Sequence, residues 1–539
     1  MAAPASQRFD TTMSDPRPGD KARLREAPAA ELVQTAFRRE IGDAAVLWPG
    51  LDLADLAHAV MLIEQGIVPA DAGAVLLRLL LELHDVPVEN FALDPTLEDV
   101  ATNREAWLRR RDETAAGWLG AGRARREPTT IAYRIAVRRR LLALSAAVAD
   151  LGHALADVAE AHVYTLMPDH TYLQQAQPTS LAHYLLSFAY PTLRDVDRLR
   201  ACFGRINESP AGIGSINGSR LPVSRERLAE LLGFDGVIVN TRDAMWQVDG
   251  PVEITAAVMA LLLNVDRLAE DLQIWTTAEF GVAEVADRHA RISFIMPQKK
   301  NPYSLAFIRG MTNASMGAMV SMTAIGRSPS AQVDNRIFAV GEVPRTLDQA
   351  LATVQLMAAV VRGLSFDRDR MRARAAEGYG HATDLAEAVM QTVGVNYRTA
   401  HRIVGTAVRL AVERHGRRGE ISADLLGEAA RTVLGRAVTV PAEVLRAVSD
   451  PAAIVATRTA RGGAAPEAIR AMLDDCRRGL AVAMAWAQET PARLDAAERR
   501  LLARAADLAR GHAAAAVDAP HGSRPRQART SRTPRARLA

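Results

Sequence analysis

A long apolar repeat between Asp249 and Trp275 restricts the fold of this chain more than any other feature of its sequence. The repeat consists of Ile254, Val258, Leu261, Val265, Leu268, Leu272 and Trp275, which follow one another at intervals of four and three residues. This spacing puts all of them on one face of a helix, and Asp249 with Pro251 suits the start of that helix. Such a helix extends for roughly 35 to 40 Å, too long for one small globular core. The repeat therefore predicts a bundle of long helices that could be shared between subunits.

Similar periodicity recurs over Ala132–His162 and Tyr303–Ile325. Aromatic residues make up only 5% of the chain, and Ala and Leu dominate, a composition that favours helices over strands. The long helices are separated by segments that read as irregular, at about 166–178, 203–222, 284–302 and 326–344. We predict an all-α fold in which these loops carry the chemistry.

With 539 residues, of which 49% are hydrophobic, the chain can bury a large core and is expected to form several domains. Beyond Arg374 the helical segments become shorter and are interrupted at Gly378, Gly394 and Pro441. We therefore divide the chain into a disordered N-terminal extension (1–28), an N-terminal helical domain (29–128), a central long-helix domain (129–376), a C-terminal helical domain (377–515) and a basic disordered tail (516–539).

The basic net charge of +4 does not indicate nucleic-acid binding, because it comes from the end of the chain. His521–Ala539 holds six arginines and no acid, so the rest of the chain carries −2. Cys202 and Cys476 are far apart and suggest neither a disulfide framework nor a metal site. The sequence has no uncharged apolar run of membrane-spanning length. We expect a cytoplasmic protein that binds no metal, nucleic acid or membrane.

The segment Ser293–Pro302 combines a hydroxyl, two ammonium groups and an amide with Phe294, Ile295 and Met296. Solvated loops seldom place three large apolar side chains among cations, because exposing apolar surface to water is unfavourable. The segment therefore predicts a loop that closes over an anionic ligand.

Within this segment, Met296–Pro302 reads Met-Pro-Gln-Lys-Lys-Asn-Pro, which is typical of argininosuccinate lyases. Further matches are spread over most of the chain and include Ala57–Leu62, Glu98–Val100, Ala176–Pro178, Ser209–Pro210, Arg225–Asp235, Trp275–Gly281 and Ala382–Leu385. On these residues the chain resembles argininosuccinate lyase, within the aspartase/fumarase superfamily. The resemblance implies three helical domains and a homotetramer, with a common core of long helices and active sites built from three subunits each. It also implies reversible cleavage of the C–N bond of a succinyl-amine, which releases fumarate without a metal or organic cofactor.

The resemblance assigns roles within the Ser293–Pro302 loop. It places the catalytic base at Ser293, and it implies that Lys299 and Asn301, with Met296 beside them, hold the substrate. Removing a proton next to a carboxylate creates a dianion, which needs fixed donors in a water-poor site. A serine is a poor base in water, so Ser293 would need cationic and backbone donors around it after the loop closes.

A second group of expected site residues lies in Thr171–Gln174, where the family usually reads Thr-His-Leu-Gln. Thr171 and Gln174 are expected to bind substrate. Tyr172 stands in place of the histidine that the family uses in proton donation or its support. Three readings remain open: Tyr172 is the acid or hydrogen-bond donor, His170 compensates, or both are structural.

The remaining expected substrate-binding residues are Asn103, Arg123 and Arg126. Argininosuccinate lyases usually carry Arg-Ser-Arg-Asn-Asp where this chain has Arg123–Glu127, so a serine and an asparagine become Ala124 and Arg126. The Arg126 guanidinium could grip a carboxylate bidentately, or it could belong to a solvated arginine cluster.

The chain also differs from the family pattern within the Ser293–Pro302 loop, just before it, and further along the sequence. Ile292 and Phe294 replace the loop's usual glycine and second serine, and the segment that helps to bind the arginine part is replaced near Gln332–Arg336. The loop is retained while the other substrate-binding segments have changed. This combination indicates a lyase that acts on a substrate other than argininosuccinate. The alternatives are ordinary argininosuccinate cleavage in arginine biosynthesis and an inactive homologue with a structural or regulatory role.

Overall fold

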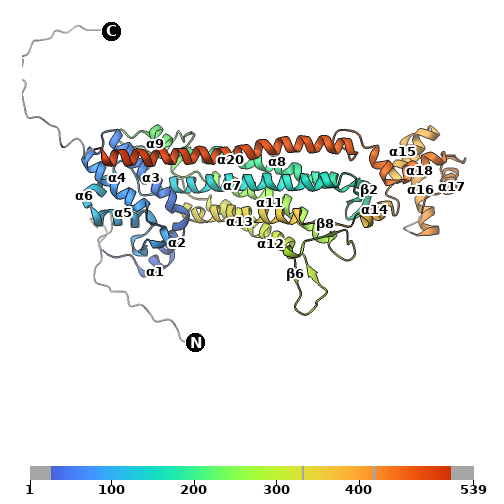
Figure 1. Cartoon of the computed structure of the whole chain (residues 1–539), viewed down its shortest axis with the longest axis horizontal. Helices are drawn as coiled ribbons and strands as arrows, with labels where there is room; N and C mark the ends of the chain where they lie inside the picture. The colour runs from blue at the N-terminus through green and yellow to red at the C-terminus, as the bar shows by residue number, and fades with distance from the viewer. Residues whose placement is uncertain (1–25, 331–332, 417–419, 512–539) are drawn as a thin grey trace, which may run out of the picture.

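The computed structural model describes residues 26–330, 333–416 and 420–511, and it is an elongated bundle of helices (Figure 1). The long helices of the bundle are α7 (Arg126–Ala161), α8 (Leu181–Ile206), α11 (Asp249–Trp275), α12 (Tyr303–Ile325), α13 (Ile337–Arg362) and α20 (Pro466–Arg510). The all-α prediction is confirmed, and the three periodic segments become α11, α12 and most of α7. The disorder predicted for 1–28 and 516–539 falls, except for residues 26–28, outside the described residues.

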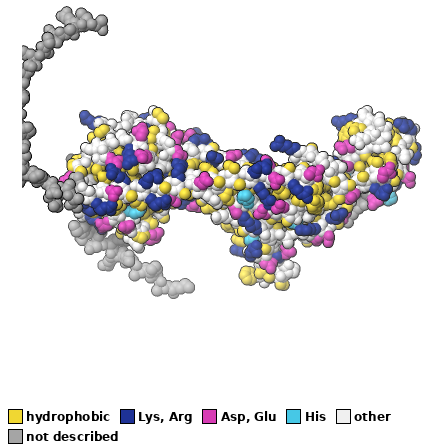
Figure 2. Space-filling view, turned by 45° about the horizontal axis from the view of Figure 1, so that its top comes forward, with side chains coloured by type: hydrophobic (Ala, Val, Ile, Leu, Met, Phe, Trp, Pro, Cys, Tyr) yellow, Lys and Arg dark blue, Asp and Glu magenta, His cyan; other side chains and the backbone are white. Residues whose placement is uncertain are grey.

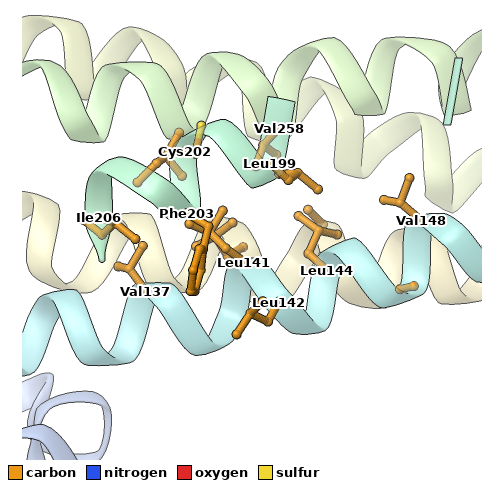
Figure 3. Close-up of a cluster of buried hydrophobic side chains, with 14 of the residues drawn as sticks. Val137, Leu141, Leu142, Leu144, Val148, Leu199, Cys202, Phe203, Ile206 and Val258 are labelled. Atoms are coloured by element: carbon orange, nitrogen blue, oxygen red, sulfur yellow. The ribbon is translucent and has the colours of Figure 1, made fainter. Parts of the chain in front are cut away.

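Helix α7 is the centre of the bundle and packs against α3 (Ala44–Glu64), α8, α13 and α20. Its apolar side chains meet those of α8 and α11 in a continuous buried cluster (Figure 3). The cluster includes Val137, Leu141, Leu142, Leu144 and Val148 from α7, Leu199, Cys202, Phe203 and Ile206 from α8, and Val258 from α11. Because apolar surface is removed from water on several sides of α7, the hydrophobic effect holds the bundle together along its length.

Two buried arginines of α7 hold the ends of neighbouring helices. Arg134 donates through Nη1 to the carbonyls of Arg205 and Ile206, at 3.0 and 3.1 Å, where α8 ends. Arg138 donates through Nη2 to the carbonyl of Leu232 at 2.8 Å, just past α9 (Arg225–Leu231). The last carbonyls of a helix have no partners within it, so these side chains replace the lost hydrogen bonds and set the register of α8 against α7.

The two ends of the bundle carry shorter helices (Figure 1). At the N-terminal end are α1 (Ala30–Leu32), the π-helical turn Val33–Phe37, α2 (Arg38–Gly42), α4 (Ala70–His84), α5 (Val100–Arg111) and α6 (Glu113–Gly117). At the other end are α14 (Arg368–Ala376), α15 (Ala382–Val393), α16 (Tyr397–His415), α17 (Ala423–Leu434), α18 (Ala442–Ser449) and α19 (Pro451–Ala456). The short α10 (Thr241–Met245) precedes α11.

The predicted C-terminal domain, 377–515, divides between two hydrophobic cores. Helices α15 to α17 bury their own cluster around Leu385, Ile403 and Leu426. Helix α20 instead joins the main core through residues such as Ile469 and Leu501, and it runs back along the bundle to α3 and α4 (Figure 1). The expectation of shorter helices beyond Arg374 is wrong for α20, which has 45 residues and packs its apolar face on the main core.

The strands are short and form pairs. Antiparallel pairs join β1 (Leu166–Thr171) to β2 (Gln174–Ser180), β5 (Ala283–Glu284) to β8 (Ser365–Phe366), and β6 (Arg291–Ile292) to β7 (Lys300–Asn301). A parallel pair joins β3 (Glu208–Ser209) to β4 (Gly236–Val237). The segment expected to be irregular at 166–178 is thus a hairpin. The one expected at 326–344 is partly helical, since α13 begins at Ile337 and continues through Pro344.

Two helices, α3 and α7, are long and apolar enough to cross a membrane by length and composition. In the structure, 83% and 67% of their most apolar windows are buried inside the protein. Their apolar character is therefore accounted for by their place in the core.

Candidate active site

The expected site residues lie in three separate places along the bundle (Figure 1). Asn103, Arg123 and Arg126 lie where α7 begins, whereas the β1–β2 hairpin follows the end of α7. At 1.5 Å per residue, the 36 residues of α7 separate these two places by about 50 Å. Ser293 and Lys299 lie in a third place, the β6–β7 hairpin, which projects from the side of the bundle (Figure 1).

The β1–β2 hairpin turns through two residues that adopt left-handed backbone conformations. Thr171 pairs with Gln174, and the φ angles of Tyr172 and Leu173 between them are 54° and 57°. Such a turn normally uses Asn or Gly, because a left-handed conformation costs other residues about 1 to 2 kcal/mol each. The turn leaves the Tyr172 side chain 98% exposed at the tip, with Thr171 and Gln174 exposed beside it.

His170 is not at this tip but behind it. Its ring lies 6.0 Å from the ring of Phe280, and burial lowers its pKa, although the carboxylates of Asp169 and Asp271 oppose this effect. The hairpin is anchored by Gln175, whose side-chain amide donates to two carbonyl groups at the end of α14, those of Arg374 and Glu377. Tyr172 and His170 thus occupy different environments.

The β6–β7 hairpin carries the loop residues Ser293, Met296, Lys299 and Asn301. The Ser293 hydroxyl accepts a hydrogen bond from the backbone N–H of Met296 at 3.1 Å. The Asn301 side chain donates to the carbonyl of Arg291 at 3.1 Å, which braces the base of the hairpin. The Lys299 ammonium has no hydrogen bond or ion pair with any residue that the structure describes, so its charge is available to an anion.

The tip of this hairpin is apolar and its base is charged. Phe294 and Ile295 are exposed, and hydrophobic side chains gather on the projection in Figure 2. Lys300 forms ion pairs of 2.7 Å with both Glu284 and Asp287. These two carboxylates are therefore ion-pair partners of Lys300 at the base of the hairpin.

Arginines at the start of α7 are paired with acids of the same chain. Arg123 lies 2.9 Å from Asp55, and Arg126 pairs with Glu40 and lies 3.5 Å from Asp99. Side chains of Arg123 and Asp55 are both buried. The solvated-cluster reading of these arginines is therefore wrong, since burial and ion pairs hold them in fixed positions.

Asn103 makes its hydrogen bonds inside the protein. Its amide nitrogen donates to the carbonyls of Asp94 and Asp99, at 3.0 and 2.9 Å, and its oxygen accepts from the backbone N–H of Asp94 at 2.7 Å. Both N–H groups of the amide are used, so Asn103 shapes the loop before α5 and has no donor left for a substrate.

The altered segment near Gln332–Arg336 also turns inward. Gln332 lies outside the described residues, but Arg336 is buried and donates to the carbonyls of Met245 and Arg126, at 2.9 and 2.7 Å. Arg336 thereby ties the start of α13 to the start of α7.

Sequence reasoning missed Glu127. This carboxylate is fully buried in the first turn of α7 and accepts hydrogen bonds from the backbone N–H groups of Gly212 and Ile213, at 2.7 and 3.1 Å. Burial raises its pKa to about 7, while these hydrogen bonds and Arg123 act in the opposite direction. The only signal in the sequence was the acid at the end of Arg123–Glu127, and its distant partner loop could not be read from spacing.

Similarity to known proteins agrees with this architecture. A family model described as Lyase matches residues 82–317, and one described as Argininosuccinate lyase C-terminal matches residues 379–456. The argininosuccinate lyase of Methanoculleus marisnigri is 35% identical over 455 residues, which cover 84% of this chain and 91% of that protein. The chain belongs to the argininosuccinate lyase family. The argininosuccinate lyase of Methanothrix thermoacetophila is 32% identical, with 84% of this chain and 91% of that protein covered.

Solved structures place this family member among the lyases of the aspartase/fumarase superfamily. An EDDS lyase in complex with formate is 32% identical, with a TM-score of 0.80, and the match covers 90% of this chain and 97% of that one. A fumarate lyase from a Mesorhizobium species shares the fold, with a TM-score of 0.64 at 21% identity over 83% of this chain and 98% of that one. The protein is therefore a carbon–nitrogen lyase with the all-α fold of this superfamily.

We expect the stability of the protein to fall as the pH rises from about 4.5 to about 7, because Glu127 has an ordinary pKa of 4.5 when unfolded and about 7 when folded. In this window the folded state keeps a proton that the unfolded state has released. The loss from this one group is about 3 kcal/mol and is complete above about pH 7.

The free energy of unfolding can be measured by urea titration at several pH values between about 4 and 8, a range that spans both pKa values. Glu127→Gln should remove this part of the pH dependence, and Glu443→Gln, which changes an exposed carboxylate on α18, should leave it unchanged. Identical pH profiles for Glu127→Gln and the native chain would contradict the assignment.

Proposed function

We propose that the protein catalyses β-elimination of an N-succinyl-amine, or the reverse addition of an amine to fumarate, and that the amine half differs from that of argininosuccinate. The observation that carries this proposal is a contrast between two places in the fold. The β6–β7 hairpin keeps the family's loop, in which Lys299 pairs with none of the described residues, whereas the arginines at the start of α7 are engaged by acids of the same chain.

The dicarboxylate half of the reaction belongs to the β6–β7 hairpin. Ser293 removes the proton next to a substrate carboxylate, and the Lys299 ammonium stabilises the dianion that forms. The N–H groups of the loop backbone supply further fixed dipoles, which are most effective once closure excludes water. The exposed Phe294 and Ile295 are suited to closure, because packing them against another surface removes apolar area from water.

Tyr172 donates the proton to the leaving nitrogen. Its phenol lies at an exposed, strained tip, a feature that often marks a functional position. The His170 ring lies beside Phe280 behind the hairpin, and we assign it a supporting role in the strand.

The amine half is altered at the start of α7. Ala124 and Arg126 replace a serine and an asparagine of the family motif, and Arg126 is occupied by Glu40 and Asp99. The Arg126–Glu40 ion pair, which is partly buried, offers a different pattern of donors and acceptors from a hydroxyl and an amide, so the preferred amine should differ too. This chain is 32% identical both to a protein named argininosuccinate lyase and to one named EDDS lyase. Sequence identity alone therefore does not indicate which amine the protein prefers.

Active sites are shared in a homotetramer. A site that combines the start of α7 with the β1–β2 tip must take them from different chains, because the length of α7 separates them by about 50 Å within one chain. The outward face of α12 is suited to association. It exposes Phe307, Met316 and Val320 with the small residues Gly310 and Gly317, and apolar helix faces of this kind are usually covered.

The reaction can be tested with a panel of N-succinyl-amines that includes argininosuccinate. The native protein should raise the ultraviolet absorbance of fumarate, fastest with a compound other than argininosuccinate. Ser293→Ala should lower the rate about 10²- to 10⁴-fold, because a general base is lost. Ser449→Ala, at the exposed end of α18, is the control. Argininosuccinate as the fastest substrate, with rescue of an arginine-requiring strain, would overturn the altered specificity, and an unchanged Ser293→Ala rate would overturn the base assignment.

Tyr172 and His170 can be separated with conservative variants. Tyr172→Phe keeps the ring but removes the hydroxyl, so kcat should fall about 10²-fold while KM changes little. His170→Gln and the control Tyr397→Phe, which alters an exposed tyrosine on α16, should retain most of the activity. Loss of activity in His170→Gln alone would reverse the two roles.

Assembly can be tested at the α12 face. A Cβ atom at Gly310 or Gly317 would meet nothing within 4 Å inside the chain, so Gly310→Leu with Gly317→Leu should leave the subunit folded but dissociate the tetramer. Gly204→Leu, at an exposed position of α8 with equally open surroundings, is the matched control. Sedimentation velocity measures the oligomeric state of each variant.

Shared active sites can be tested by mixing two inactive variants. Mixed Ser293→Ala and Tyr172→Phe chains should recover part of the activity, and a native monomer with full activity would contradict shared sites.

A further inference from the structure

A cavity of about 220 Å³ lies behind the β1–β2 hairpin, away from its tip. Its walls come from the hairpin, from the end of α11 with the turn that follows, and from α14. The floor is formed by the buried apolar side chains of Met167, Trp275, Val282 and Met371. A cavity of this size can hold one ring or a short branched chain, but not a peptide segment.

The rim of the cavity is polar and aromatic. His170, Phe280, Glu279 and Arg374 lie there. The Arg374 guanidinium is paired with Glu377 at 3.0 Å. In contrast, the Glu279 carboxylate has no hydrogen bond or ion pair within the residues that the structure describes. The rim therefore presents a carboxylate whose charge is not neutralised by a neighbouring side chain.

The charge that the cavity lining leaves available to a ligand is negative. Besides Glu279, the carboxylates of Asp169 and Asp271 act on the His170 ring. Arg370 is close, but its guanidinium donates to the backbone carbonyls of Ala278 and Glu279, at 3.1 and 3.3 Å, and not to a carboxylate. Among the charged side chains that line the cavity, the Arg374 guanidinium is paired with Glu377, so the Glu279 carboxylate is the charge left for a ligand, and it attracts a cation and repels an anion.

We propose that this cavity is a second ligand site, which takes an organic cation: an ammonium group on an apolar body of about one ring. The body packs on Met167, Trp275 and Met371, where it leaves water. The ammonium lies at the rim against the Glu279 carboxylate and near the Phe280 ring, whose face attracts cations through its quadrupole. The site is separate from the proposed reaction centre, which needs the hairpin tip and not its back.

A ligand in this cavity would influence the position of the β1–β2 hairpin tip through strand β1. His170 contributes to the rim, and two residues later the same chain segment makes the strained turn at Tyr172. An occupied cavity would brace the hairpin against α14, to which it is already tied by Gln175. An amine that binds here would therefore alter how Tyr172 is presented.

Three probes of nearly the same shape test the site: benzylamine, benzyl alcohol and benzoate, which are cationic, neutral and anionic at neutral pH. Binding is followed by tryptophan fluorescence of the full-length protein, with Trp275→Phe to identify the signal from the cavity floor. Benzylamine should quench Trp275 and bind about five- to tenfold more tightly than benzyl alcohol, and benzoate should bind most weakly.

Glu279→Gln should weaken benzylamine binding about five- to tenfold and leave benzyl alcohol unchanged. Glu387→Gln, which changes an exposed carboxylate on α15, should affect neither. Benzoate binding as tightly as benzylamine, the same benzylamine affinity in Glu279→Gln, or no quenching that depends on Trp275 would each overturn the proposal. Because binding is measured without turnover, this result is independent of whether the proposed lyase reaction is correct.

Discussion

The burial of α7 is the constraint on which the rest of the structure depends. Helices α3, α8, α13 and α20 surround it, so its apolar residues leave water on several sides at once. Its buried arginines, Arg134 and Arg138, take up the free carbonyls at the ends of α8 and just past α9. A rigid helix of this length also keeps its two ends far apart. The groups at its start and those in the hairpin after its end cannot meet within one chain.

This separation gives each part of the chain a different electrostatic character. At the start of α7, Arg123 and Arg126 are neutralised by acids of the same chain, and Glu127 is buried against a loop of backbone N–H groups. In the β6–β7 hairpin, Lys299 instead has no partner among the residues that the structure describes, and it lies beside exposed apolar residues. Taking Arg123 out of water carries a desolvation cost that its ion pair with Asp55 must offset, whereas the exposed Lys299 ammonium stays hydrated.

Much of the fold and only part of the site could be predicted from the sequence. Periodic apolar residues identified α7, α11 and α12 because helix formation and one-sided burial are local properties. The loop Ser293–Pro302 was found because its chemistry is contiguous. The hairpin at Leu166–Ser180 was missed, since its strand pairing depends on a turn at Tyr172 and Leu173 that has none of the usual turn residues. The Asn103 amide was assigned to substrate although it is used up inside its own loop.

The sequence by itself determined that the chain is an assembly of long amphipathic helices, and it predicts that one loop carries the groups needed to recognise an anion. Both follow from the order of neighbouring residues. Only the tertiary structure decided which core α20 joins, which acids hold Arg123 and Arg126, that Glu127 is buried, and that His170 faces a cavity while Tyr172 faces outward. These outcomes depend on contacts between residues far apart in the chain, and spacing along the sequence contains no information about which distant groups will meet.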